Sequence, residues 1–233
     1  MNSFDSTITL FINQFARHSK LLDAFMISMS VDVLIPATLF CMLIWYFWFR
    51  KSVNQYYIRS SLISTLIGSC FGALFSRLIQ VFLPIRELPM TRLDIGFVLP
   101  YFSNGPSPEH LSSFPSDHAT LLFGLVFGLF LVSRVVGFLG FIYIFLIMVV
   151  PRIFVGFHYP TDILAGALIG LIFVYTAHSN FVKNRIIRKI LNWSNNSPEW
   201  FYPFLFLITY ETAIFFLDMR HLARLIIDLI TLI

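Results

Sequence analysis

Residues 112–130 read SSFPSDHATLLFGLVFGLF and place a polar turn directly before a long apolar run. The polar turn ends with Ser116, Asp117 and His118, and the apolar run that follows, 119–130, contains one polar side chain, Thr120. A helix that is apolar all round belongs in a membrane or in a large core. Titratable groups are costly in a membrane and mark functional positions there. We therefore expect a membrane helix whose amino end carries part of a functional site.

The composition of the whole chain supports an integral membrane protein. The 233 residues are 58% hydrophobic and 12% charged, and 28 of them are Phe, whereas soluble domains are about 25% charged. The formal net charge of +4 is too small to indicate a nucleic-acid partner. We expect one membrane-embedded domain over 1–233, with a core of about 20–178 and extra helices over about 200–233.

The apolar runs predict an all-α bundle of six transmembrane helices. A short amphipathic helix is expected before them, over 4–17, lying at the membrane surface. After them, the apolar stripe in 222–233 predicts an interfacial helix or an extension of the last span. The six predicted spans are about 31–49, 60–83, 118–134, 138–155, 160–177 and 200–217.

Basic residues in the short loops set the expected orientation. They cluster at 50–59, at Arg134 and at 183–189, which places these loops on the cytoplasmic side. The loop 84–117 and the GFHYPTD turn then share the outer side. The first residues do not resemble a signal peptide. Cys41 and Cys70 lie in apolar runs and are expected to be buried thiols without a disulfide.

Three polar segments are expected to meet on the outer side, namely 76–89, 114–118 and 151–162. Together they supply arginines, a hydroxyl group, two histidines and a carboxylate. Cations neutralise phosphate oxygens, a histidine is a suitable nucleophile, and a second one can protonate a leaving oxygen. This set indicates phosphoryl transfer.

In the third segment, Asp162 follows His158 by four residues, and Arg152 precedes it by six. A carboxylate beside one imidazole nitrogen would fix the tautomer and leave the other nitrogen as the nucleophile. Arg152 could grip a phosphate through two parallel hydrogen bonds.

In the second segment, Ser116 stands at the expected start of a helix, where free N–H groups bind anions. His118 can protonate a leaving oxygen. Asp117 either holds a basic partner or orients the loop.

The pattern P-S-D-H followed by R-x5-H-x3-D resembles the type 2 phosphatidic acid phosphatase superfamily. The resemblance covers about residues 20–178. It implies a six-helix membrane bundle and a reaction without metal or cofactor, through a phosphohistidine. By this resemblance His158 is the nucleophile, Asp162 orients and supports it, His118 is the acid, and the phosphoryl oxygens are bound by Arg86, Ser116 and Arg152.

The chain departs from the family pattern at several positions. Asp117 stands where the family usually has Gly, and Pro151 where it has Ser. In the first motif, Arg86 is followed by Glu87 rather than Pro, and no Lys lies seven residues before it.

Arg77 is the nearest basic candidate for that missing Lys. Its offset of two residues turns a helical side chain by about 200°. Arg77 is therefore either a further substrate ligand or a side chain that snorkels or pairs with a carboxylate.

The P-S-D-H variant is similar to that of bacterial undecaprenyl pyrophosphate phosphatases, which recycle the lipid carrier of cell-wall synthesis. The resemblance implies a polyprenyl or phospholipid substrate, a place in the bacterial inner membrane with the site facing outward, and a link to bacitracin resistance. Three alternatives stay open: a phosphatase for phosphatidic acid, phosphatidylglycerol phosphate or lipid A; a lipid phosphotransferase; and a non-catalytic transporter or scaffold. The sequence leaves the oligomeric state open.

Overall fold

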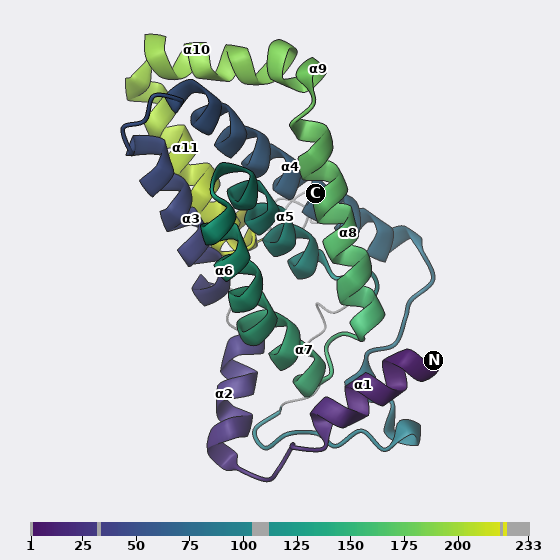
Figure 1. The fold of residues 1–233 in the computed structure, drawn as a ribbon. Coiled ribbons are helices and arrows are strands. Elements are labelled where there is room, and N and C mark those ends of the chain that lie inside the picture. The colour runs from purple at the N-terminus through teal and green to yellow at the C-terminus, as the bar shows by residue number, and fades with distance from the viewer. Residues whose placement is uncertain (1, 32–33, 104–111, 220, 223–233) are drawn as a thin grey trace.

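The computed structural model describes residues 2–31, 34–103, 112–219 and 221–222 (Figure 1). Within these residues the fold contains helices and no strands, which confirms the all-α prediction. A π-helical stretch, Phe145–Val149, joins the helices Arg134–Ile144 and Val150–Val155 into one rod. The helices are α1 Ser3–Asn13, α2 Lys20–Val31, α3 Leu34–Phe49, α4 Gln55–Phe82, α5 Asp117–Val132, α6 Arg134–Ile144, α7 Val150–Val155, α8 Pro160–Ala177, α9 Asn180–Val182, α10 Arg188–Asn196 and α11 Pro198–Ala213.

The prediction of six membrane spans is not confirmed. Among the described residues, three helical rods are long and apolar enough to cross a membrane: α4, α6–α7 and α8. A fourth span results if α2 and α3, bent by 53°, are counted as one. At 16 residues each, α5 and α11 are shorter than the roughly 20 residues that a span needs. The predicted tail helix, 222–233, lies outside the described residues apart from Leu222.

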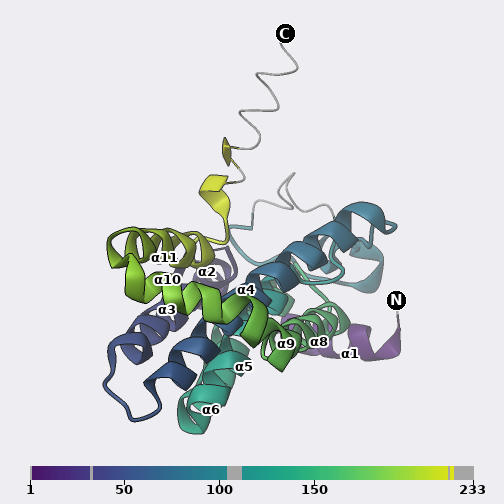
Figure 2. The same cartoon turned by 90° about the horizontal axis from the view of Figure 1, so that it is seen from above.

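The centre of the molecule is a bundle of α4, α5 and α8, which pack more extensively on each other than on other helices (Figure 2). Glycine permits the close approach of α5 and α8. A Cβ atom added at Gly166 or Gly170 would lie 2.2 Å from the carbonyl oxygen of Ser116 or Thr120, respectively. The amino end of α5 is therefore held directly against the first turns of α8.

One end of the molecule collects the predicted cytoplasmic loops. The carboxyl end of α3, the amino end of α4, the α5–α6 connection and α10 all lie there (Figure 1). The basic patch at 183–189 belongs to a helical segment, α9–α10, that lies across this end rather than to a loop. The helices α1 and α2 lie at the opposite end (Figure 1).

The N-terminal helix is amphipathic as predicted, but its buried face is the polar one. Asp5, Thr9 and Asn13 follow each other at every fourth residue and are all buried. Phe4 and Phe11 on the other faces are 49% and 64% exposed. Since α1 packs on α7 and α8, its polar stripe faces the bundle. The helix ends at Asn13 and not at 17, and α2 has no counterpart among the predicted helices.

Candidate active site

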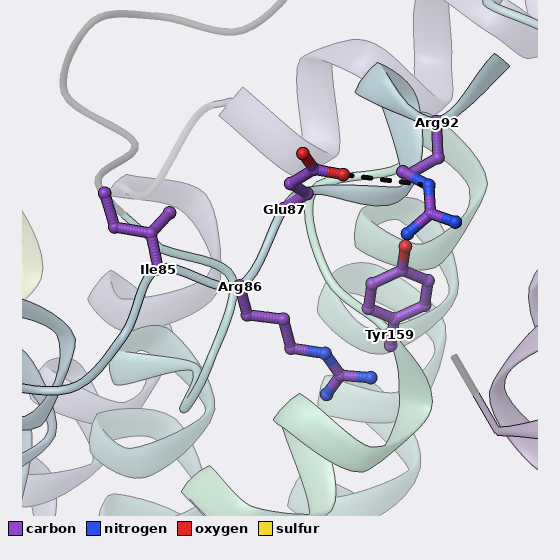
Figure 3. A pocket seen from close by; sticks show the side chains of 5 residues that line it. All are labelled: Ile85, Arg86, Glu87, Arg92 and Tyr159. Carbon is purple, nitrogen blue, oxygen red and sulfur yellow. Dashed lines mark ion pairs between the residues drawn. The ribbon is translucent and has the colours of Figure 1, made fainter.

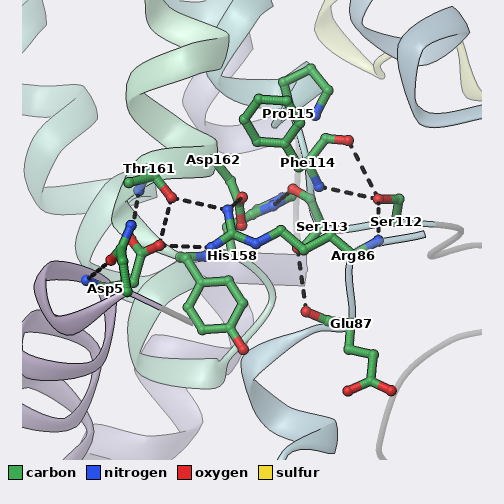
Figure 4. A network of polar contacts seen from close by, with 12 residues as sticks. Asp5, Arg86, Glu87, Ser112, Ser113, Phe114, Pro115, His158, Thr161 and Asp162 are labelled. Carbon is green, nitrogen blue, oxygen red and sulfur yellow. Dashed lines mark hydrogen bonds and ion pairs between the residues drawn. The ribbon is translucent and has the colours of Figure 1, made fainter. Parts of the chain in front are cut away.

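Backbone hydrogen bonds link the three predicted polar segments (Figure 4). The Ser113 N–H donates to the Arg86 carbonyl at 3.0 Å, and the Ser116 N–H donates to the Asp162 carbonyl at 3.1 Å. The Nδ1 atom of His158 lies 2.8 Å from the Ser113 carbonyl oxygen. The segment 112–118 thus runs between the other two. The predicted convergence of these segments is confirmed.

The amino end of α5 is built as predicted. Ser116 has extended backbone angles, and its Oγ accepts a hydrogen bond from the Ala119 N–H at 3.3 Å, which is the standard role of a serine before a helix. Gln80 of α4 anchors the preceding residue by donating to the Pro115 carbonyl at 2.6 Å. The Ser116 hydroxyl hydrogen is not used by this cap, so its predicted donation to a phosphate stays a prediction.

His158 lies in the turn between α7 and α8 and is 4% exposed. Gly156 forms this turn with φ of 86°, a conformation that favours glycine. Because a carbonyl accepts from Nδ1, that nitrogen carries the hydrogen and Nε2 keeps its lone pair. Burial, and then the charge of Arg152, lower the pKa of His158 to about 3. The imidazole is therefore neutral and able to attack at neutral pH.

This assignment predicts how His158 titrates. We expect its ring to stay neutral from pH 8 down to about pH 4.5, whereas an unperturbed histidine gains a proton near pH 6.5. Since the pKa is lower in the folded state, the ring favours folding fully above pH 6.5, and this contribution is lost as the pH falls from 6.5 toward 3. Carbon-13 NMR of histidine-labelled protein measures the titration, with His158→Gln identifying the resonance. A midpoint near pH 6.5 would contradict the assignment.

Asp162 does not pair with His158 as the sequence spacing predicts. Its carboxylate accepts from the Tyr159 N–H at 2.7 Å and from the Arg86 guanidinium. The i, i+4 argument holds only inside a helix, and α8 begins at Pro160, after His158. Asp162 therefore caps the start of α8, and the imidazole takes the Ser113 carbonyl as its partner.

Arg86 reaches the site, but carboxylates already neutralise its charge. It pairs with Asp162 and, at 2.7 Å, with Asp5 of α1. Its guanidinium lies over the Tyr159 ring, 4.4 Å from the centroid, and donates to the Thr161 hydroxyl at 2.9 Å. Figure 4 shows this network between α1 and the start of α8. Arg86 thus has the contacts of a structural tie.

The sequence reasoning missed Asp5, which completes this tie. Its carboxylate is fully buried and accepts from both the backbone N–H and the hydroxyl of Thr161, at 3.0 and 2.7 Å. The available signal was the polar stripe of α1 at a spacing of four residues, which indicates a face turned toward protein rather than toward water.

A second group of polar side chains, apart from the network of Arg86, Asp162 and Asp5, consists of Arg77, Asp117 and His118. One oxygen of Asp117 lies 2.8 Å from Nδ1 of His118, and the other lies 3.7 Å from Arg77. Arg77 also donates to Gln80 at 2.9 Å. Of the two roles considered for Asp117, holding a basic partner is confirmed. Arg77 is this basic partner. Of the two alternatives for Arg77, pairing with a carboxylate is therefore the one that the structure shows.

Arg152 is the unusual member of the site. It is 4% exposed, and among the described residues its guanidinium makes no hydrogen bond or ion pair. Its Nε atom is buried without a partner. A buried, unpaired charge is costly, and a bound anion would offset this cost. The Arg152 carbonyl accepts a hydrogen bond from the Phe157 N–H at 3.0 Å, so Arg152 stands at the end of α7, directly before the turn that holds His158.

An open pocket adjoins the site at Arg86 and Tyr159, with Ile85, Glu87 and Arg92 as its other lining residues (Figure 3). Arg92 is bound to Asp94 at 2.6 Å and lies 3.7 Å from Glu87. Because its charge is already balanced, Arg92 is a weak candidate for a phosphate ligand. Within the described part of the chain, no three His, Cys, Asp or Glu side chains gather as metal ligands.

Residues 95–186 match the sequence profile of the PAP2 superfamily. The chain contains a PAP2 superfamily domain. The matched range includes Ser116, His118, Arg152, His158 and Asp162, and the expected resemblance is confirmed. Other members of the site come from outside the PAP2 range, among them Asp5, Arg77 and Arg86.

Two curated proteins are similar to the region around the PAP2 domain. The bacitracin transport permease protein BcrC of Bacillus licheniformis is 28% identical over 130 residues, 56% of this chain and 58% of its own length. The lipid A 1-diphosphate synthase of Escherichia coli K12 is 30% identical over 132 residues, 54% of each chain. The chain thus spans a little more than half the length of these relatives. No solved structure gives a significant match.

Proposed function

We propose that this protein is a membrane lipid phosphatase that removes the terminal phosphate of undecaprenyl pyrophosphate through a phosphohistidine at His158. The observation that carries the proposal is the buried, unpaired guanidinium of Arg152 at the end of α7, directly before the turn that holds the neutral imidazole of His158. A phosphoryl group supplies both the negative charge and the acceptor atoms that this guanidinium lacks. The same group brings an electrophilic phosphorus to the lone pair of His158.

In the first step, Nε2 of His158 attacks the terminal phosphorus, and the bond from phosphorus to the bridging oxygen breaks. His118 gives its proton to that oxygen, so that undecaprenyl phosphate leaves. In the second step, water attacks the phosphohistidine, and His118 takes a proton from the water. The P–N bond then breaks and releases inorganic phosphate. Arg152 and the amino end of α5 stabilise the charge on the phosphoryl oxygens in both steps.

Asp162 and Arg86 have a positioning role in this proposal. Asp162 accepts a hydrogen bond from the backbone N–H of Tyr159, the residue that follows the nucleophile. Arg86 forms ion pairs with both Asp162 and Asp5. Together they hold the His158 turn against the start of α8. Both side chains are thus already paired, whereas Arg152 has no partner among the described residues.

The choice of a polyprenyl diphosphate rests on the P-S-D-H form of the second motif and on the similarity to BcrC. We propose a bacterial inner-membrane location with the site facing outward, which the basic residues gathered at the opposite end support (Figure 1). The second relative is named as a lipid A 1-diphosphate synthase. Its similarity favours phosphate transfer to lipid A as the second candidate function.

A substrate panel tests the proposal. The full chain, purified in detergent, is assayed for phosphate release from undecaprenyl pyrophosphate, phosphatidic acid, phosphatidylglycerol phosphate and lipid A, with and without EDTA. We expect kcat/KM for the diphosphate to exceed that for each monoester by about tenfold or more, a difference of about 1.4 kcal/mol, and to be unchanged by EDTA. Faster hydrolysis of a monoester would reject the substrate choice.

The two other functions give different results in the same assay. A phosphotransferase moves a radioactive terminal phosphate from the diphosphate to lipid A. A non-catalytic transporter or scaffold releases no phosphate from any substrate and forms no covalent adduct on histidine.

A further inference from the structure

The side chain of His118 is held from two directions by residues whose role the motif does not explain. Asp117 contacts its edge, with Oδ1 2.8 Å from Nδ1. Phe215, which follows α11, covers its face: the ring centroids are 3.8 Å apart and the rings are within 10° of parallel. Phe215 is 4% exposed and lies outside the PAP2 range of 95–186.

The contact with Asp117 decides which nitrogen of His118 can exchange a proton. The same Oδ1 also accepts the His118 backbone N–H at 2.8 Å, so the carboxylate is fixed relative to the start of α5. Arg77 lies 3.7 Å from the other oxygen and favours its ionised form. With an ionised carboxylate at Nδ1, that nitrogen keeps its hydrogen, and the proton given or taken during reaction is the one on Nε2.

The contact with Phe215 fixes the plane of the ring. Phe215 and Phe216 have φ of 61° and 55°, a left-handed conformation that is rare for bulky residues and persists only where the surroundings enforce it. The aromatic face is negative and attracts a cation, so it favours the protonated imidazole that a general acid needs.

We propose that Asp117 and Phe215 are positioning residues that hold His118 as the acid, with its transferable proton on Nε2. This inference rests on the proposed function, in which His118 protonates the leaving oxygen. The inference explains why an aspartate, Asp117, stands at the position where the family usually has Gly. It also makes the segment after α11 a part of the site.

Leaving-group dependence provides the test, because an activated leaving group departs without a proton. The enzyme, Asp117→Asn and Phe215→Leu are assayed with aryl phosphates whose phenols range from nitrophenol to unsubstituted phenol. We expect kcat for phenyl phosphate to fall about 100-fold in Asp117→Asn and about tenfold in Phe215→Leu, within the range of general acid catalysis. For the nitrophenyl ester we expect less than about a threefold loss, with KM little changed.

Matched controls are Glu199→Gln and Phe206→Leu, which change an exposed carboxylate and an exposed ring and should leave the whole series unchanged. Phe215→Tyr keeps the aromatic face and should restore most of the phenyl phosphate activity. Equal losses for all esters, in variants that unfold at the wild-type temperature, would overturn the positioning role. A wild-type enzyme inactive on every ester and on every lipid would instead reject the proposed function.

If Asp117→Asn does not fold, the decision rests on Phe215→Leu compared with Phe215→Tyr.

Discussion

Replacement of His158 by alanine is expected to lower kcat by about 10⁴-fold or more, the range found when a catalytic nucleophile is removed. The imidazole is buried, neutral at physiological pH, and oriented by the Ser113 carbonyl. No other neutral nitrogen base is held in that turn. Initial rates of phosphate release from undecaprenyl pyrophosphate measure the loss.

The intermediate gives a second measurement of the same prediction. A reaction stopped with alkali should leave one phosphoryl group on the wild-type chain, on the peptide that contains His158. The P–N bond is labile to acid, so acid treatment should release the group. In His158→Ala, free imidazole should restore part of the turnover by filling the vacated space.

His18→Ala is the control, because His18 is exposed and is not among the residues of the candidate site. It should retain full activity. Phosphorylation of His158→Ala at the wild-type level would place the nucleophile elsewhere in the chain.

The sequence patterns predicted the parts of the site that depend on local structure. Ser116 caps α5 because a serine before an apolar run, followed by free N–H groups, is a local signal. Pro160 begins α8 for a similar reason, since its fixed φ suits the first helical turn. The second and third motifs were therefore correctly predicted to meet, with His158 and Asp162 in contact with the segment that leads into α5.

The pairing of acids with histidines was harder to predict. The spacing favoured Asp162 with His158, but the structure pairs Asp117 with His118 and gives His158 a backbone carbonyl. A spacing of four residues implies contact only where both residues are helical. A backbone carbonyl leaves no trace in the side-chain pattern, so no spacing rule finds it.

Contacts between residues far apart in the chain could not be predicted from the sequence, for a different reason. Asp5 contacts Thr161 across 156 residues, and Phe215 contacts His118 across nearly half the chain. An acidic residue in a helix or a phenylalanine near a span is common in any membrane protein. Only the fold selects the particular ones that reach the site.

Replacement of Arg152 by methionine is expected to stabilise the empty protein and to remove its activity. Methionine fills a similar volume without charge, and the structure gives the guanidinium no partner among the described residues. Apolar replacement of a buried ion pair often stabilises by about 1–4 kcal/mol, and an unpaired guanidinium has no ionic attraction that offsets its desolvation. Loss of a charge-stabilising donor lowers kcat by about 10²–10³-fold. Thermal unfolding in detergent and initial rates measure the two effects.

Ligand-dependent stability separates this explanation from a merely structural one. Inorganic phosphate at about 100 times its Kd should stabilise the wild type by about 2.7 kcal/mol and should have no effect on Arg152→Met. Arg152→Lys retains the charge but loses the planar fork, so it should bind phosphate more weakly than the wild type. Arg134→Met, at the exposed start of α6, is the control and should change stability by less than about 0.5 kcal/mol. If Arg152→Met is less stable than the wild type and still gains stability from phosphate, Arg152 is part of the packing and not the anion ligand, because a site built for a phosphoryl group must lose its ligand together with its charge.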